Sequence, residues 1–240
     1  MNIFVTLQLY QKQRKTIKKL KSLALCSVLL FSVSSNINAT EVETVVNIAG
    51  ASNYVFRGMT QTNDKAALSL EGGVSYNGFF SGLWTSNIDF EGLDADRELD
   101  LYAGYTKDIY GFETTLTYTK FLYPNSKDVA NLDEAELKVI YPIDKLSLGG
   151  KYAISTYVEN DGKSYNYYEG LASYDFDIIK MNTSAGSLKN AGDNYTVGIS
   201  KLFELSKGSL NLELIYSNFS TDSVSLKDEE NLFAKATYSF

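Results

Sequence analysis

The chain has 240 residues, a formal net charge of −7, one cysteine and no histidine. The lack of histidine excludes Ser-His and Cys-His nucleophilic catalysis and metal sites built on imidazole. The acidic balance argues against a nucleic-acid partner, because binding to phosphates needs clustered cations.

The first 39 residues have the pattern of a signal peptide. A basic segment that ends at Lys21 is followed by an apolar run at 23–33 and a cleavage box at 37–39. The run is too short to cross a membrane as a helix, which needs roughly 20 residues. We therefore expect a signal peptide at 1–39, cleaved near Ala39, and one exported domain at 40–240. Because the segment holds six of the 22 basic residues and none of the 29 acids, this domain has a net charge of −13.

Beyond Glu41, the sequence predicts twelve β-strands and no helix. Apolar residues recur at every second position with polar residues between them, so each strand has one apolar and one polar face. In the third strand we expect Phe80 and Trp84 on the apolar face, and in the eighth we expect Tyr167 and Glu169 on the polar face. The predicted strands are, in chain order, 42–57, 68–76, 80–90, 98–106, 112–118, 134–141, 146–155, 165–176, 179–185, 195–200, 210–217 and 231–240.

The connections between these strands alternate in length. After even-numbered strands they are short, beginning with Asn77-Gly78, which is a strong hairpin signal. After odd-numbered strands most are longer and more polar, such as 122–133, 158–164 and 220–230. An even number of strands with both ends on the short-turn side is typical of outer-membrane barrels, which have turns in the periplasm and loops outside. The sequence therefore predicts an all-β protein, a transmembrane antiparallel up-and-down β-barrel of 12 strands.

Aromatic residues gather at both ends of the predicted strands. Rings in these positions fit the two interfacial girdles of a membrane barrel. The last strand ends on Phe240, an aromatic terminus that suits a lipid interface and through which we expect the barrel assembly machinery to bind. The residues expected in the girdle at the long-loop end are Tyr54, Phe56, Phe90, Tyr118, Phe121, Tyr123, Tyr195 and Phe219.

Three segments resemble N-terminal motifs of the TorF porin family. They are Asn-Tyr-Val-Phe-Arg-Gly-Met-Thr-Gln at 53–61, Gly-Leu-Trp-Thr-Ser-Asn-Ile-Asp-Phe at 82–90 and Glu-Leu-Asp-Leu-Tyr-Ala-Gly-Tyr at 98–105. Together they lie in the first third of the exported chain, and the strand pattern matches over its whole length. The resemblance implies a porin in the outer membrane of a Gram-negative bacterium, and it names no solute.

Charged residues on the polar strand faces are predicted to face the lumen, because Arg or Lys facing lipid costs roughly 2–4 kcal/mol near the midplane. With Glu43 and Lys180 included, ten acids face five bases. The predicted pore-lining residues are Arg57, Glu71, Asp89, Glu98, Asp100, Glu113, Glu134, Glu136, Lys138, Lys151, Glu169, Glu213 and Lys235.

The number of strands predicts a narrow lumen. Eight strands leave an interior filled by side chains, and 16 to 18 leave an open aqueous channel. We therefore expect a mildly acidic channel for passive diffusion of small neutral or cationic solutes. Arg57 is the lone arginine on a polar strand face, and we expect it to pair with Glu71, Asp89 or Glu98 and to shape a constriction near the outer end.

Two other functions remain open. A structural barrel with a plugged lumen could act through acidic outer loops such as 222–230. An enzyme is less favoured, because carboxylates two residues apart, such as Glu98 and Asp100, fit a solvated lumen wall better than a catalytic pair. We expect no catalytic residue, metal or cofactor, and we expect outer-membrane lipid and small solutes as partners. Lipidation of Cys26 is disfavoured because the bulky Leu25 precedes it.

Overall fold

The structure is a computed structural model that describes residues 42–157, 164–221, 223 and 226–240. The predicted signal peptide at 1–39 lies outside the described residues, as does most of the connection at 158–164. Within the described residues the chain forms fourteen strands: β1 (Glu43–Ala51), β2 (Val55–Phe56), β3 (Met59–Thr60), β4 (Ala67–Tyr76), β5 (Phe79–Asn87), β6 (Arg97–Ile109), β7 (Phe112–Leu122), β8 (Leu132–Ile143), β9 (Leu146–Tyr157), β10 (Ser164–Asp175), β11 (Lys180–Leu188), β12 (Gly192–Glu204), β13 (Ser209–Ser220) and β14 (Glu229–Ser239).

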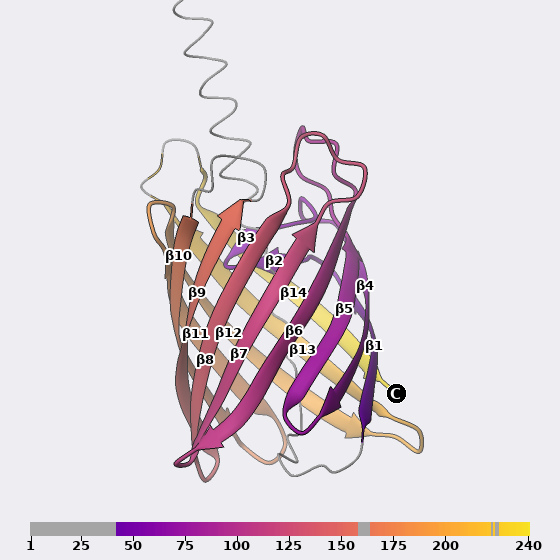
Figure 1. The fold of residues 1–240 in the computed structure, drawn as a ribbon, viewed down its shortest axis with the longest axis vertical. Coiled ribbons are helices and arrows are strands. Elements are labelled where there is room, and N and C mark those ends of the chain that lie inside the picture. Colours follow the sequence, from indigo (N-terminus) through magenta and orange to yellow (C-terminus); the bar gives the residue numbers. More distant parts are fainter. Residues whose placement is uncertain (1–41, 158–163, 222, 224–225) are drawn as a thin grey trace, which may run out of the picture.

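Twelve of these strands close into one antiparallel barrel (Figure 1). Each barrel strand pairs with its neighbours in sequence, and β1 pairs with β4 because β2 and β3 form a separate two-stranded sheet. The last strand closes the barrel against the first, from Asn47 opposite Ser239 to Ala51 opposite Lys235. The predicted all-β, twelve-stranded up-and-down barrel is confirmed. No helix in the described part of the chain is long and apolar enough to cross a membrane.

The barrel has an apolar outer face and a polar inner face. On β13, Leu212 and Leu214 are 42% and 47% exposed on the outside, while Glu213 between them faces the lumen. This arrangement follows from β-geometry, in which successive side chains point to opposite faces. The predicted sidedness is confirmed for every barrel strand except β5.

Tight turns join the strands at the lower end of the barrel in Figure 1. Asn77 and Gly78 connect β4 to β5 with φ angles of 50° and 81°, and Tyr110 and Gly111 connect β6 to β7 with 56° and 85°. Two successive positive φ angles are the signature of the type I′ turn, whose twist matches that of the flanking strands. The five predicted short connections are confirmed. At the other end most connections are longer, with 189–191 as an exception.

Strand β5 has the opposite sidedness to the prediction. Phe80 and Trp84 face the lumen, whereas Phe79 and Leu83 face outward with 64% and 46% exposure. Both faces of this strand carry large apolar residues as well as polar ones, so hydrophobicity does not decide between them. The two-residue turn decides, because it pairs Tyr76 with Phe79, and paired residues share a face. Since Tyr76 points outward, Phe79 does too, and its successor Phe80 points inward.

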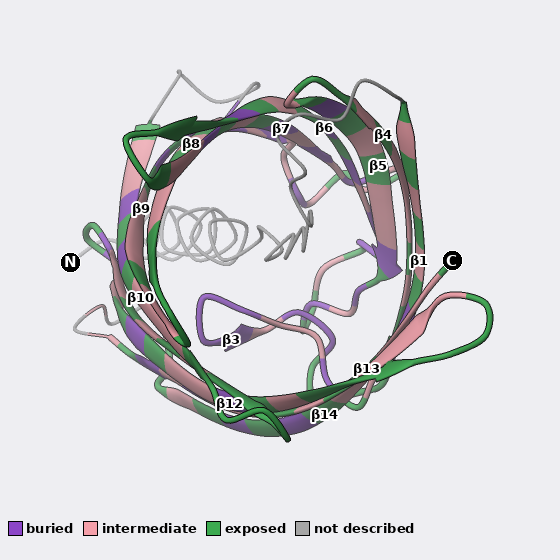
Figure 2. Cartoon of the chain, turned by 90° about the horizontal axis from the view of Figure 1, so that it is seen from below, coloured by how far each residue is buried: buried purple, intermediate pink, exposed green. Residues whose placement is uncertain are grey.

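The first predicted strand is shorter than expected. β1 ends at Ala51, and the chain then enters the barrel as the β2–β3 hairpin, which lies inside the ring of strands in Figure 2. Arg57 and Gly58 form the hairpin's turn with φ angles of 47° and 84°. Arg57 therefore lies at the tip of an inserted hairpin and not on a barrel strand. Phe56 beside it is 1% exposed inside the barrel and does not face lipid.

An outer band of aromatic residues lies at the short-turn end. There the exposed rings of Phe79 and Tyr105 lie 4.5 Å apart between centroids, and those of Phe112 and Tyr141 lie 4.8 Å apart. The girdle predicted for the long-loop end is wrong for six of its eight members, because these pack inside the barrel or in its loops. The six are Tyr54, Phe56, Phe90, Phe121, Tyr123 and Phe219.

Candidate functional site

A cavity of about 580 Å³ lies inside the barrel, and polar and apolar side chains both line it. Hydroxyl and amide side chains form much of its wall, among them Thr115, Thr117 and Asn182. Five acids and five bases also line it, so the charges of the described lining balance. The ten charged residues are Arg57, Glu113, Glu134, Glu136, Lys138, Lys151, Glu169, Lys180, Glu213 and Lys235. The predicted acids Glu43, Glu71, Glu98 and Asp100 lie on inner strand faces outside this lining.

The β2–β3 hairpin is anchored to the inner wall on one side. Asn231 on β14 donates a hydrogen bond from Nδ2 to the Gly58 carbonyl at 3.0 Å, and Asn53 donates to Oδ1 of Asn231 at 3.0 Å. The backbone N–H of Thr60 donates to Glu229 Oε2 at 2.7 Å. These bonds hold the hairpin against the β13–β14 wall, where Gly58 lies so close to Asn218 that an added Cβ would be 2.5 Å from its carbonyl oxygen.

Arg57 clamps the hairpin to the other side of the lumen. Its Nη2 lies 3.1 Å from both carboxylate oxygens of Glu134 on β8, and its guanidinium carbon lies 3.9 Å from the ring centre of Tyr167 on β10. Ser155 also donates a hydrogen bond to Glu134. The two charged side chains are only 2% and 7% exposed. The predicted partners of Arg57, which were Glu71, Asp89 and Glu98, are therefore wrong, because the tip of the hairpin reaches β8.

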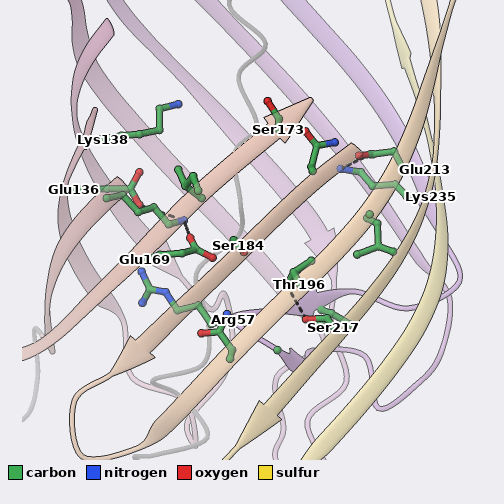
Figure 3. Close-up of a pocket in the computed structure, with 18 of the residues that line it drawn as sticks. Arg57, Glu136, Lys138, Glu169, Ser173, Ser184, Thr196, Glu213, Ser217 and Lys235 are labelled. Atoms are coloured by element: carbon green, nitrogen blue, oxygen red, sulfur yellow. Dashed lines mark hydrogen bonds and ion pairs between the residues drawn. The ribbon is translucent and has the colours of Figure 1, made fainter. Parts of the chain in front are cut away.

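A second charged cluster lies next to the Arg57 clamp. Lys151 on β9 places its Nζ 2.9 Å from Glu169 on β10 and 3.7 Å from Glu136 on β8. The two acids of this cluster are labelled in Figure 3. Nearer the short-turn end, Lys235 lies 3.7 Å from Glu213. Lys138 and Lys180 also line the cavity, and neither forms an ion pair with a described carboxylate. The β8–β11 wall thus carries paired charges and two lysines that face the lumen unpaired.

Four predicted pore-lining residues are not among those that line the cavity. Glu98 and Asp100 are fully buried on the inner side of β6, and Glu71 accepts hydrogen bonds on β4 from Asn47 and Tyr102. Asp89 is a wrong prediction for a different reason. β5 ends at Asn87, and Asp89 lies in the connection after it, where it forms an ion pair with the exposed Lys65.

Sequence reasoning missed the aromatic side of the lumen. Tyr54, Phe80, Trp84 and Tyr102 all line the cavity, and the rings of Tyr54 and Trp84 lie 5.4 Å apart. Phe80 and Trp84 were placed on the lipid face because their strand carries large apolar residues on both sides. The parity imposed by the two-residue turn at 77–78 was the signal that could have placed them.

Apolar side chains fill much of the outer end of the barrel. The cluster includes Phe56 from the hairpin, Phe90 and Tyr123 from the β5–β6 and β7–β8 connections, and Leu132 from β8. Asp94 joins the two connections, because its carboxylate accepts hydrogen bonds from Ser126 Oγ at 2.6 Å and from the backbone of 127 and 128. The hydroxyl and backbone donors lower the pKa of Asp94 to about 2. The outer mouth is therefore narrowed by packed loops as well as by the hairpin.

The fold is similar to that of solved outer-membrane channels. A structure of the KdgM porin in complex with disordered oligogalacturonate is 13% identical, with a TM-score of 0.58 over 82% of this chain and 99% of that one. A structure of the NanC porin is 9% identical, with a TM-score of 0.53 over 81% and 98%. An outer-membrane channel from Pseudomonas putida F1 is 11% identical, with a TM-score of 0.52 over 85% and 97%. Identities this low show a shared fold alone.

Sequence comparison identifies the family. No curated protein matches the chain. The match to a family covers residues 36–217, which span the strands from β1 to most of β13. The chain belongs to the family described as bacterial protein of unknown function (Gcw_chp).

Proposed function

We propose that the protein is a porin-like channel of the outer membrane that lets small neutral or cationic solutes diffuse through a narrow lumen. The observation that carries this proposal is a cavity lined by charged and hydroxyl side chains inside a closed barrel whose outer face is apolar. A charged inner wall is favourable only if it is hydrated or paired, because an isolated buried charge is costly. The similarity in fold to outer-membrane channels and the resemblance to the TorF porins support the same function.

The preference for neutral or cationic solutes rests on the distribution of charge around the lumen. The inner faces of β1, β4, β5 and β6 carry no lysine or arginine, and their acids are Glu43, Glu71, Glu98, Asp100 and Asp108. The bases of the lumen lie on the hairpin and on β8 to β14, where most of them pair with acids. A cation can therefore follow the β4–β6 side of the lumen without meeting a fixed positive charge.

Liposome swelling tests the channel. The refolded protein would be inserted into vesicles and exposed to sugars, amino acids and amines of graded size and charge. We expect swelling with small neutral and cationic solutes, a steep decline with size, and slower entry of anions of equal size. Anions entering faster than cations of the same size would contradict the selectivity.

The plugged structural barrel is a second candidate, and the packed outer mouth favours it. In this case Phe56, Phe90 and their neighbours would seal the outer end, and the loops outside would carry the function. The two candidates differ in the same assay. A sealed barrel inserts into vesicles, as judged by resistance to urea extraction, yet no solute of any size swells them.

Localisation and assembly belong to the same proposal. We propose that the segment at 1–39 directs export and is cleaved near Ala39, and that the assembly machinery recognises β14 through Phe240. Phe240 is 67% exposed on the outer face next to Tyr238, whose ring centre is 4.7 Å away. Replacing Phe240 with Asp should lower the amount of folded barrel in outer-membrane fractions. An unchanged amount would contradict the role of this residue.

A further inference from the structure

One side of the lumen combines aromatic rings with carboxylates and carries no base. Trp84 on β5 lies in register between Glu71 on β4 and Asp100 on β6, all three on the inner face. Side chains in register on neighbouring strands have Cβ atoms roughly 4.5–5.5 Å apart. Tyr54 leans against this row, with its ring centre 5.4 Å from that of Trp84 and its hydroxyl 3.4 Å from Glu98 Oε1. Trp84 is therefore an electron-rich surface flanked by negative charge.

The charge of Glu71 is held by neutral donors. Asn47 Nδ2 donates to one of its oxygens at 2.8 Å, and the Tyr102 hydroxyl donates to the other at 3.1 Å. Among the described residues, no lysine or arginine forms an ion pair with Glu71. The two hydrogen bonds fix the carboxylate without cancelling its charge, so its field extends into the lumen.

Glycines keep this part of the lumen open. The Tyr102 hydroxyl lies over Gly82 and Gly73, and a Cβ on Gly82 would be only 2.3 Å from it. With no side chain at these positions, the Tyr102 ring lies against the wall. The cavity then reaches Trp84, Tyr54 and Phe80, which all line it.

Elsewhere in the lumen an aromatic ring is already covered by cationic side chains of the protein itself. The ring of Tyr167 faces the Arg57 guanidinium at 3.9 Å and the Lys151 ammonium at 5.6 Å. Among the described residues, no lysine or arginine lies over Trp84. Tryptophan attracts cations more strongly than tyrosine or phenylalanine. The Trp84 ring can therefore make with a cationic solute the cation–π contact that the Tyr167 ring makes with Arg57.

We infer that Trp84 and Tyr54, which line the cavity, form a binding site for an organic cation, a solute with an alkylated ammonium group. Glu71 does not itself line the cavity, but it lies in register beside Trp84 and supplies the negative charge. The ring faces attract the cation through their quadrupoles, the carboxylate attracts it through its charge, and the alkyl groups displace water from apolar surface. The inference rests on the proposed channel and specifies its substrate class. Solutes of this kind would pause at the site on their way through the lumen.

Trp84 is the only tryptophan of the chain, so its fluorescence reports on this site directly. The refolded barrel in detergent micelles would be titrated with choline, with its neutral isostere 3,3-dimethylbutan-1-ol, and with KCl at matched ionic strength. We expect choline to change the emission in a saturable manner and the isostere and KCl to have little effect. Glu71→Gln should weaken choline binding by roughly tenfold. Asp133→Asn, which alters a carboxylate paired with Lys120 at the barrel wall, should leave binding unchanged.

A second variant protects the test against misfolding. Tyr54→Leu removes one ring, keeps the Trp84 reporter and leaves Glu71 in place, and it should weaken choline binding several-fold. Equal responses to choline and to the neutral isostere, or equal affinity in wild type, Glu71→Gln and Tyr54→Leu, would overturn the site. If vesicles swell with cationic solutes while Trp84 does not respond to choline, the channel stands and the site fails. If choline binds but no solute swells the vesicles, the site stands and the channel fails.

Discussion

Glu134→Gln should release the β2–β3 hairpin from the β8 wall without unfolding the barrel. The substitution keeps the volume of the side chain but removes the negative charge that faces the Arg57 guanidinium. Because the two side chains are 2% and 7% exposed, water cannot solvate the guanidinium once its partner's charge is removed. Breaking a buried ion pair by removing one partner costs about 3–5 kcal/mol. The cost falls on the hairpin, since the barrel strands keep their own backbone hydrogen bonds.

The Gln61 amide measures this release. It donates a hydrogen bond to the Tyr54 carbonyl across the base of the hairpin at 2.6 Å. If the local opening free energy falls by about 3 kcal/mol, hydrogen exchange at this amide should become about a hundredfold faster. Glu213→Gln is the matched control, because its partner Lys235 lies at 3.7 Å with 30% exposure and the pair does not touch the hairpin.

A double substitution separates the charge from the packing. Arg57→Met with Glu134→Met replaces the ion pair by apolar side chains of similar length, which in other proteins is often neutral or stabilising. We expect exchange at Gln61 to return close to the wild-type rate. Unchanged exchange in Glu134→Gln, or equal acceleration in Glu213→Gln, would refute the claim that Arg57 and Glu134 clamp the hairpin.

Three further predictions follow from other parts of the barrel. Gly82→Ala should lower the unfolding midpoint in urea by an amount equivalent to about 1–3 kcal/mol, because its Cβ would collide with Tyr102 and with the Gly72 carbonyl, whereas Gly50→Ala meets nothing within 4 Å and should have little effect. Asp94→Asn should make the 88–96 and 123–131 connections more susceptible to protease at pH 5. In wild type the pKa of Asp94 is lowered to about 2, so the stability that its carboxylate gives to these connections is complete above about pH 4 and is lost as the pH falls through 2. The two proteins should therefore be cleaved alike near pH 2. Lys138→Glu with Lys180→Glu should shift the reversal potential in a KCl gradient toward greater cation selectivity, and a shift toward anions would contradict the placement of these lysines in the lumen.

The alternation of apolar and polar residues and the lengths of the connections predicted most of the fold. The Leu212, Glu213, Leu214 pattern on β13 predicts which side chains face outward, because the period of a strand is two and each face meets one environment. The dipeptide Asn77-Gly78 fixes a two-residue turn through its positive φ angles. These local rules act within a few residues, so they can be read from the chain itself.

The candidate site was less predictable, because it depends on contacts between distant residues. Arg57 alternates correctly with its neighbours, yet the chain leaves the wall after Ala51 and carries Arg57 across the lumen to Glu134, 77 positions later. On β5, hydrophobicity does not distinguish the two faces and Trp84 was assigned to the wrong one, although the parity of the turn at 77–78 predicts the correct face. Loop aromatics such as Phe90 and Tyr123 were also placed in lipid, because nothing local distinguishes a membrane girdle from the inside of a packed mouth.

Single-channel conductance most directly tests the claim that a water-filled lumen is narrowed by an inserted hairpin. Wild-type protein would be compared in planar bilayers with a variant in which residues 54–62 are replaced by a short Gly-Ser linker, after both are shown to be folded barrels. The account predicts a small, steady conductance for wild type and one several-fold larger for the variant. Equal conductances would contradict the role of the hairpin, and the absence of conductance in both would contradict the open lumen itself.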